Sequence, residues 1–204
     1  MFESNLLKMR CTLIFVLSVL SLACAAPPRS DNENLSYFLR YVETIRGIQI
    51  HNMLVVTVKF VEQVVNSVPV EHRGPGSHVL ETFANRGRAL QQRGSTAEKY
   101  VYIYDLQEVF EGLKNNLSQS SPESQKIGMS IIGLLGVASE FAKEDEMVHN
   151  KFVEGATRLK TKVSPATIAR ESELFNAVNK YVTSSDVQQH ETLIEDVLRF
   201  KNRY

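Results

Sequence analysis

Apolar residues recur at intervals of three and four over most of the chain, a spacing that places side chains on one face of an α-helix. The first stripe consists of Leu35, Phe38, Leu39, Val42 and Ile45. It predicts a helix over about residues 31–67. The β-branched stretch at 54–58 would also suit a strand, but no partner strand is visible elsewhere, so we expect it to be helical too.

Signals for helix ends divide the rest of the chain. A Gly/Pro loop at 69–76 breaks the pattern, and Ser77 is a candidate N-cap after it. Ser95 and Glu98 form a capping box, while Ser121-Pro122 and Ser164-Pro165 have proline at the first helical position. These boundaries predict an all-α fold, a single bundle of about six or seven helices over residues 26–204.

One predicted helix, at about 122–142, is apolar on every side from Ile127 to Ala138, so we expect it to lie at the centre of the bundle. Its glycines each cost about 1 kcal/mol against alanine in a helix interior. They therefore indicate either close helix packing or an apolar cavity for a small molecule. The candidate cavity residues are Gly128, Gly133, Gly136, Ile132 and Leu135.

The first 25 residues have the three parts of a cleavable signal peptide. Lys8 and Arg10 precede an apolar stretch at 11–22, and Ala23-Cys24-Ala25 is a small-residue cleavage site. We expect cleavage after Ala25 and a secreted, extracellular protein.

Alternatives to this interpretation remain open. An uncleaved membrane anchor is disfavoured because the uncharged run at 11–26 is shorter than the about 20 residues that span a bilayer. A lipoprotein modified at Cys24 would have Ser21 where leucine is usual. Met9 is a second candidate start residue, which would shorten the leader and leave its role unchanged.

Cysteine positions and charge limit the chemistry of the mature chain. The chain's 2 cysteines, Cys11 and Cys24, both lie in the leader, so the mature chain is cysteine-free and must be stabilised by packing. The 23 basic and 23 acidic residues balance, which argues against nucleic acid as a partner. No stable membrane span is expected after signal removal. Sequons at Asn34 and Asn116 predict a glycoprotein.

Catalytic motifs are incomplete, so we expect no enzyme and no cofactor. Ser130 lies in a sequence like a nucleophile elbow, but Ile132 replaces the second glycine. His190 begins a sequence like a zinc-protease helix, but Ile194 replaces the second histidine. Glu146 and His149 form a single Glu-x-x-His pair, for which a structural role is expected because a di-iron bundle needs two such pairs.

The sequence thus predicts a secreted, non-enzymatic helical binding protein. Its partner would be an unknown extracellular protein or an apolar small molecule. An alternative is a structural or regulatory factor that acts only through protein–protein contacts, which predicts an exposed apolar patch in place of an enclosed cavity. A third interpretation is a metal-dependent enzyme that uses Glu146 and His149.

Overall fold

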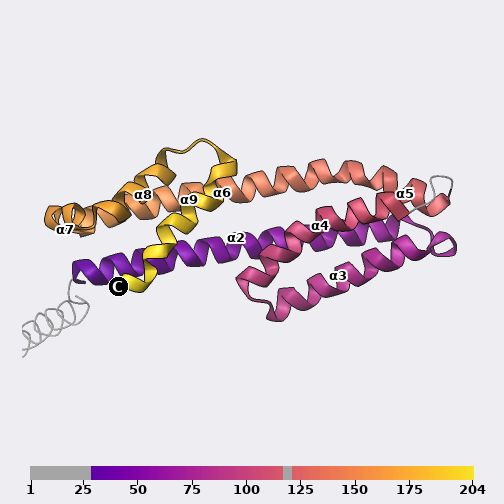
Figure 1. Cartoon of the computed structure of the whole chain (residues 1–204), viewed down its shortest axis with the longest axis horizontal. Coiled ribbons are helices and arrows are strands. Elements are labelled where there is room, and N and C mark those ends of the chain that lie inside the picture. Colours follow the sequence, from indigo (N-terminus) through magenta and orange to yellow (C-terminus); the bar gives the residue numbers. More distant parts are fainter. Residues whose placement is uncertain (1–28, 117–120) are drawn as a thin grey trace, which may run out of the picture.

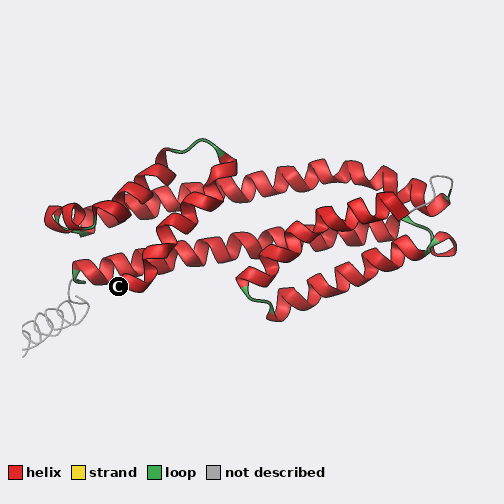
Figure 2. Ribbon diagram, viewed as in Figure 1, coloured by secondary structure: helices red, strands yellow, loops and turns green. Residues whose placement is uncertain are grey.

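The computed structural model describes residues 29–116 and 121–204, so the predicted signal peptide lies outside the described residues. Within those ranges every regular element is a helix, which confirms the all-α bundle (Figure 2). The elements are α2 (Asp31–Ser67), η1 (Val70–His72), α3 (Pro75–Arg93), α4 (Thr96–Asn116), α5 (Pro122–Ser130), η2 (Ile131–Gly133), α6 (Leu134–Lys162), α7 (Pro165–Arg170), α8 (Ser172–Thr183), α9 (Val187–Leu198) and η3 (Arg199–Arg203).

The molecule is elongated, and α2 runs along most of its length (Figure 1). The second long helix, α6, lies alongside α2, and the two are in extensive contact. At one end α3 and α4 pack against the second half of α2, and at the other end α8 and α9 pack against α2 and α6. The chain thus forms one elongated bundle whose two ends are built on a shared pair of long helices.

Each end of the bundle has its own hydrophobic core. The first, which we call the α8–α9 core, joins the first half of α2 to the second half of α6, and it includes Leu39, Phe152, Val178 and Phe200. The second, the α3–α4 core, joins the second half of α2 to α3, α4 and α5, and it includes Leu54, Val61, Leu80, Tyr102 and Ile127. Most of the stripe positions expected from the sequence lie in one of these cores.

The N-terminal cap of α4 is the one that the sequence predicts, whereas the N-terminal cap of α3 is not. Glu98 accepts hydrogen bonds from the Ser95 amide at 2.8 Å and the Ser95 hydroxyl at 2.6 Å, so the predicted capping box is confirmed. The prediction that Ser77 caps α3 is wrong, since α3 begins at Pro75. Its N-terminus is capped by Glu123 of α5, which accepts from the amides of Gly74 and Ser77, each at 2.7 Å.

The prediction of a central helix at 122–142 is wrong in its position. The segment forms α5, η2 and the start of α6, and its apolar side chains lie largely at the surface. The axis of the molecule is occupied instead by α2, which contacts α3, α4, α5, α6 and α9. The 122–142 segment contacts α2 on one side, and Met129, Ile132 and Leu135 stay exposed. Among the described residues, no helix combines the length and the low polarity that crossing a bilayer requires.

Candidate functional site

The most unusual surface of the protein is where α5 passes into α6. Met129 is 69% exposed, Ile132 is 72% exposed and Leu135 is 75% exposed, and Ile131 beside them is 37% exposed. We call these four residues the apolar face. The segment is anchored by Ile127 and Val137, which are buried in the α3–α4 core.

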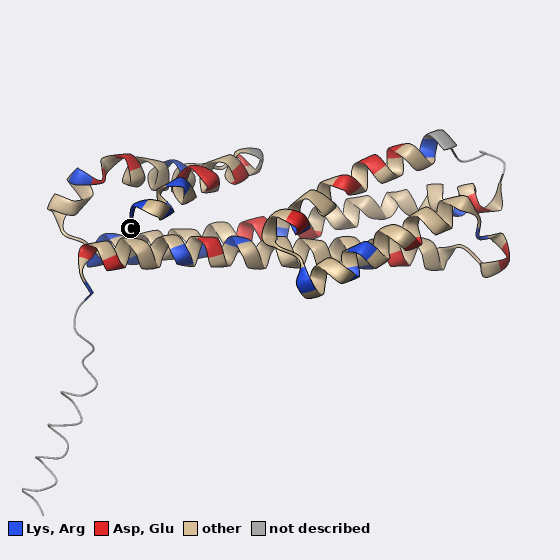
Figure 3. Cartoon of the chain, turned by 60° about the horizontal axis from the view of Figure 1, so that its bottom comes forward, with Lys and Arg blue, Asp and Glu red and all other residues tan. Residues whose placement is uncertain are grey.

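This surface lacks the charges that normally cover an exposed helix. No residue from Ile127 to Ser139 is charged, and Figure 3 shows a long run of helix without blue or red where α5 passes into α6. Single exposed apolar residues are ordinary on protein surfaces, but contiguous apolar patches mark binding sites. The apolar face is therefore the first candidate for a functional site.

A groove runs along one flank of the segment, between α2 and α6, with a volume of about 590 Å³. We call it the α2–α6 groove. Phe60 and Val64 of α2 line one wall, while Met129 and Gly133 line the other. Polar groups stand at its rim, among them Lys59, Gln63 and Glu140. The Ser67 and Ser130 hydroxyls are hydrogen-bonded at 3.0 Å between its two walls.

A second groove of about 560 Å³ lies on the other flank, between α4 and α6, and we call it the α4–α6 groove. Its lining is mainly apolar and consists of Met53, Ile103, Leu106, Phe110, Ile131, Leu134, Val137, Ala138 and Phe141, with Tyr104, Gln107, Glu111 and Lys114 as the polar members. Ligand sites are typically concave, of this size, and lined by apolar residues with a few polar groups.

The predicted cavity residues are divided between these surfaces. Gly133 and Gly136 line the α2–α6 groove, and a Cβ atom at Gly133 would lie 2.8 Å from the Phe60 ring, so this glycine permits close approach to α2. Gly128 has no neighbour within 4 Å of a Cβ position. Ile132 and Leu135 project from the surface and line neither groove. The segment therefore offers two open grooves and an apolar ridge between them.

A polar cluster lies between α6, α8 and α9. The spacing of Asp145 and His149 places them on one helix face, but the sequence did not indicate that His190 joins them. His190 Nδ1 is 2.7 Å from Asp145 Oδ2, and its Nε2 is 3.2 Å from the Ser184 carbonyl. The His149 ring stacks on His190 with centroids 5.0 Å apart, and Tyr181 packs against both rings. Burial lowers the pKa of His149, and His190 lowers it further. The cluster is a buried junction of three helices.

The Glu146–His149 pair does not develop into a metal site. Glu146 is exposed, while His149 turns into the polar cluster and its Nδ1 is buried without a hydrogen-bond partner. The residues that the structure describes contain no group of three or more side chains placed to hold a metal ion. Of the two motif residues, Ser130 is hydrogen-bonded to Ser67 at 3.0 Å, and His190 belongs to the polar cluster with Asp145.

The two sequons occupy different environments. Asn34 lies in the first turn of α2 and is only 8% exposed, and its amide nitrogen donates to the carbonyls of Arg29 at 3.3 Å and Lys162 at 3.2 Å. A glycan would have to displace these contacts, so the structure disfavours Asn34 as an acceptor. Asn116 is the last residue of α4, and its side chain lies outside the described part of the chain.

Comparison with protein-family models, with curated proteins and with solved structures gave no match. The function must therefore be inferred from the surfaces of the protein itself.

Proposed function

We propose that this is an exported, non-enzymatic helical protein that binds a partner protein through the apolar face. The observation that carries the proposal is the exposure of Ile132 and Leu135, 72% and 75%, within a helical segment that has no charge to cover them. Leaving such residues in water forgoes about 1.5–3 kcal/mol each that burial would provide. A partner that covers them recovers this free energy.

The geometry suits an amphipathic helix as the partner element. Two grooves flank a ridge of apolar side chains, and a helix that lies along this surface can place its own apolar residues in either groove. Gly128 and Gly136 have open space where their side chains would be, so a partner backbone can approach them closely. Burial of the ridge and at least one groove would give a continuous interface.

The proposal can be tested with paired substitutions. Ile132→Glu combined with Leu135→Glu places two charges on the apolar face, and Val187→Glu serves as the control because Val187 is 54% exposed on α9. Partners co-purified with the protein from extracellular fluid should be lost with the double variant and retained with the control. Equal recovery with both variants would contradict the proposal.

Export itself is tested by N-terminal sequencing of protein collected outside the cell. The signal peptide predicts Ala26 as the first residue. A chain that still begins at Met1 or Met9, or protein found only inside the cell, would contradict export without affecting the binding surface.

An apolar small molecule is a second candidate, supported by the α4–α6 groove. Ala138 lines this groove, so Ala138→Trp should fill it, whereas Ala142→Trp alters the same helix one turn later outside the lining. Binding of an environment-sensitive apolar dye should weaken at least about tenfold for Ala138→Trp only, as expected when a ligand loses more than about 1.4 kcal/mol of contact. Equal weakening by both variants, or by neither, would exclude the groove.

A further inference from the structure

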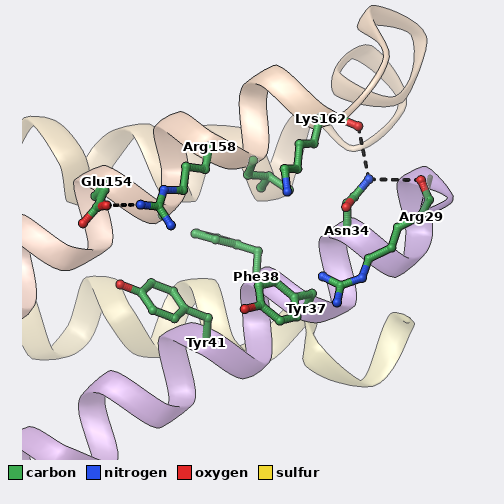
Figure 4. Close-up of a pocket in the computed structure, with 10 residues that line it drawn as sticks. Arg29, Asn34, Tyr37, Phe38, Tyr41, Glu154, Arg158 and Lys162 are labelled. Carbon is green, nitrogen blue, oxygen red and sulfur yellow. Dashed lines mark hydrogen bonds and ion pairs between the residues drawn. The ribbon is translucent and has the colours of Figure 1, made fainter. Parts of the chain in front are cut away.

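We propose that a separate cleft, at the end of the molecule opposite to the apolar face, binds a small organic anion with one apolar ring or a short chain. The cleft lies between the first turns of α2 and the last turns of α6 and has a volume of about 170 Å³ (Figure 4). Because it is remote from the apolar face, it is independent of the partner surface.

The floor of the cleft is apolar and fixed in position. Phe38 and Leu159 belong to the α8–α9 core and are 3% and 4% exposed. The Tyr41 ring is seated against Gly155, where a Cβ atom would lie 2.7 Å from the ring, and the Tyr41 hydroxyl donates to the Lys151 carbonyl at 3.2 Å. The floor therefore presents ordered aromatic and aliphatic carbon to a ligand.

The walls of the cleft carry three cations and one carboxylate. Arg158 pairs with Glu154, and Figure 4 shows this pair on one side of the cleft. The Arg29 guanidinium lies 4.4 Å from the centre of the Tyr37 ring. Within residues 29–116 and 121–204, neither Arg29 nor Lys162 forms an ion pair with a carboxylate. Neither of these two positive charges is thus compensated by a direct ion pair.

The helix dipole does not account for both of these charges. Cations are stabilised at helix C-termini, which explains Lys162 at the end of α6. Arg29, however, precedes the N-terminus of α2, where the dipole disfavours a cation and attracts an anion.

The carboxylates of the α2 first turn are engaged elsewhere. Asp31 accepts hydrogen bonds from the Ser164 hydroxyl at 2.7 Å and the Thr167 hydroxyl at 2.6 Å. Glu33 accepts from the Ser30 amide at 2.7 Å. Neither forms an ion pair with Arg29 or Lys162, although Arg29 is near enough to Glu33 to contribute to the lowering of its pKa. An anionic ligand would supply the direct counter-charge that the cleft lacks.

Asn34 holds the two sides of the cleft together. Its amide nitrogen donates both to the Arg29 carbonyl and to the Lys162 carbonyl, so the residues that carry these two charges are linked through their backbones. This link reduces the ordering that a ligand would otherwise have to impose. The backbone positions of the two residues are therefore set before the ligand arrives, while their side chains can adjust to it.

The volume sets the size of the ligand. A cavity of about 150 Å³ accommodates benzene. The cleft therefore suits one ring with a carboxylate on the side of Arg29 and Lys162. A neutral molecule of the same shape would provide no negative charge to pair with Arg29 and Lys162.

Titration of the protein with three probes tests the proposal, with the Gly155 amide and the Tyr41 ring followed by NMR. Benzoate should shift these signals in a saturable way, while benzamide, which is neutral, should bind at least about tenfold more weakly, because hydrogen bonds to a charged group contribute about 1.5–3 kcal/mol. Inorganic phosphate, which has no apolar part, should also bind at least about tenfold more weakly. Failure of benzoate to bind, or equal binding of benzoate and benzamide, would overturn the proposal.

Substitution of each cation, with a neighbouring lysine as the control, tests which positive charges contribute to benzoate binding. Lys162→Gln and Arg29→Gln should each weaken benzoate binding about tenfold, because each removes one charge-assisted contact. Lys160→Gln is the matched control, since Lys160 lies on the same turn of α6 and its amine donates to Asn179 at 2.8 Å. Equal effects of Lys160→Gln and Lys162→Gln, or no effect of either, would overturn the assignment. Circular dichroism of each variant checks that the fold is retained.

Discussion

The second half of α6 and the apolar segment that precedes it differ in how far their apolar side chains are buried. The half after Glu144 is amphipathic, and its apolar residues Val148, Phe152, Ala156 and Leu159 are buried against α2, α8 and α9. The segment before it, from α5 through η2 into the start of α6, has no charge between Ile127 and Ser139, yet Ile132 and Leu135 are exposed. The more apolar of the two segments is thus the less buried one.

The comparison teaches that burial depends on the available partners as well as on composition. An amphipathic helix needs a neighbour on one face only, and α2 with α8 and α9 provides it. A helix that is apolar on all sides needs neighbours all round, whereas α2, α3 and α4 leave Ile132 and Leu135 of the α5–α6 segment exposed. The surface that this leaves uncovered is the proposed binding site.

The largest expected effect is on the free energy of unfolding, which a core substitution should lower far more than a substitution on the apolar face. Phe152 is 0% exposed and its ring packs against Phe38 and Tyr181, so Phe152→Ala should lower the free energy of unfolding by about 4 kcal/mol. Ile132→Ala should change it by less than about 0.5 kcal/mol. Chemical denaturation of both variants measures the difference. Comparable losses would show that Ile132 is part of a core.

Capping of α3 by Glu123 should give the next largest effect. Glu123→Ala leaves the Gly74 and Ser77 amides without their acceptor and should cost about 2 kcal/mol of stability. Glu123→Gln keeps an oxygen at this position and should cost less. If both variants unfold like the original protein, the carboxylate does not anchor α5 to α3.

The same carboxylate predicts a dependence on pH. Burial alone would raise the pKa of Glu123, but the hydrogen bonds from the α3 N-terminus, above all from Ser77, outweigh burial and lower it below its ordinary 4.5. The stabilisation is therefore complete above pH 4.5 and is lost as the pH falls below that value. Glu123→Gln should remove this part of the acid sensitivity in denaturation curves recorded at successive pH values.

A pair of glycine variants tests how closely the α5–α6 segment packs against α2. Gly136→Ala meets no neighbour and should stabilise the protein by up to about 1 kcal/mol through helix propensity. Gly133→Ala would place its Cβ 2.8 Å from the Phe60 ring, so the gain should be cancelled or reversed. Thermal melts of the two variants compare these effects. An equal gain in both would mean that the segment does not approach α2.

The smallest expected effect concerns His149, in the buried second half of α6. Because burial and His190 lower the pKa of His149 from its ordinary 6.5, the folded state binds a proton there less readily than the unfolded state. This contribution to stability is complete above pH 6.5 and decreases as the pH falls through the lowered pKa. His149→Phe should flatten the stability profile between about pH 7 and pH 5. An unchanged profile would assign the dependence to other groups.

Local signals predicted most of the fold. The 31–67 helix, the Ser95 capping box and the amphipathic stripe of residues 148–159 follow from spacing and cap chemistry, which depend on neighbours in the sequence. The prediction for the 122–142 segment failed because burial is a tertiary property. Nothing near Ile132 in the sequence shows that α2 occupies the axis of the molecule.

The candidate sites were predictable in part. The glycines indicated a site in the α5–α6 segment, and Gly133 and Gly136 do line a groove there. The partners across that groove and the remote cap at Glu123 depend on contacts between distant residues, and so does the cluster of Asp145, His149 and His190. The anion cleft joins Arg29 and Lys162, and no local pattern brings these two residues together.

Thiol labelling of introduced cysteines tests the exposure of the apolar face most directly. In a background of Cys11→Ser and Cys24→Ser, the variants Ile132→Cys and Val148→Cys each carry a single thiol. In the native protein the thiol at position 132 should react as fast as a free cysteine, while the thiol at position 148 should be protected. Protection of position 132 to the same degree in the native monomer would contradict the conclusion that this face is open for a partner.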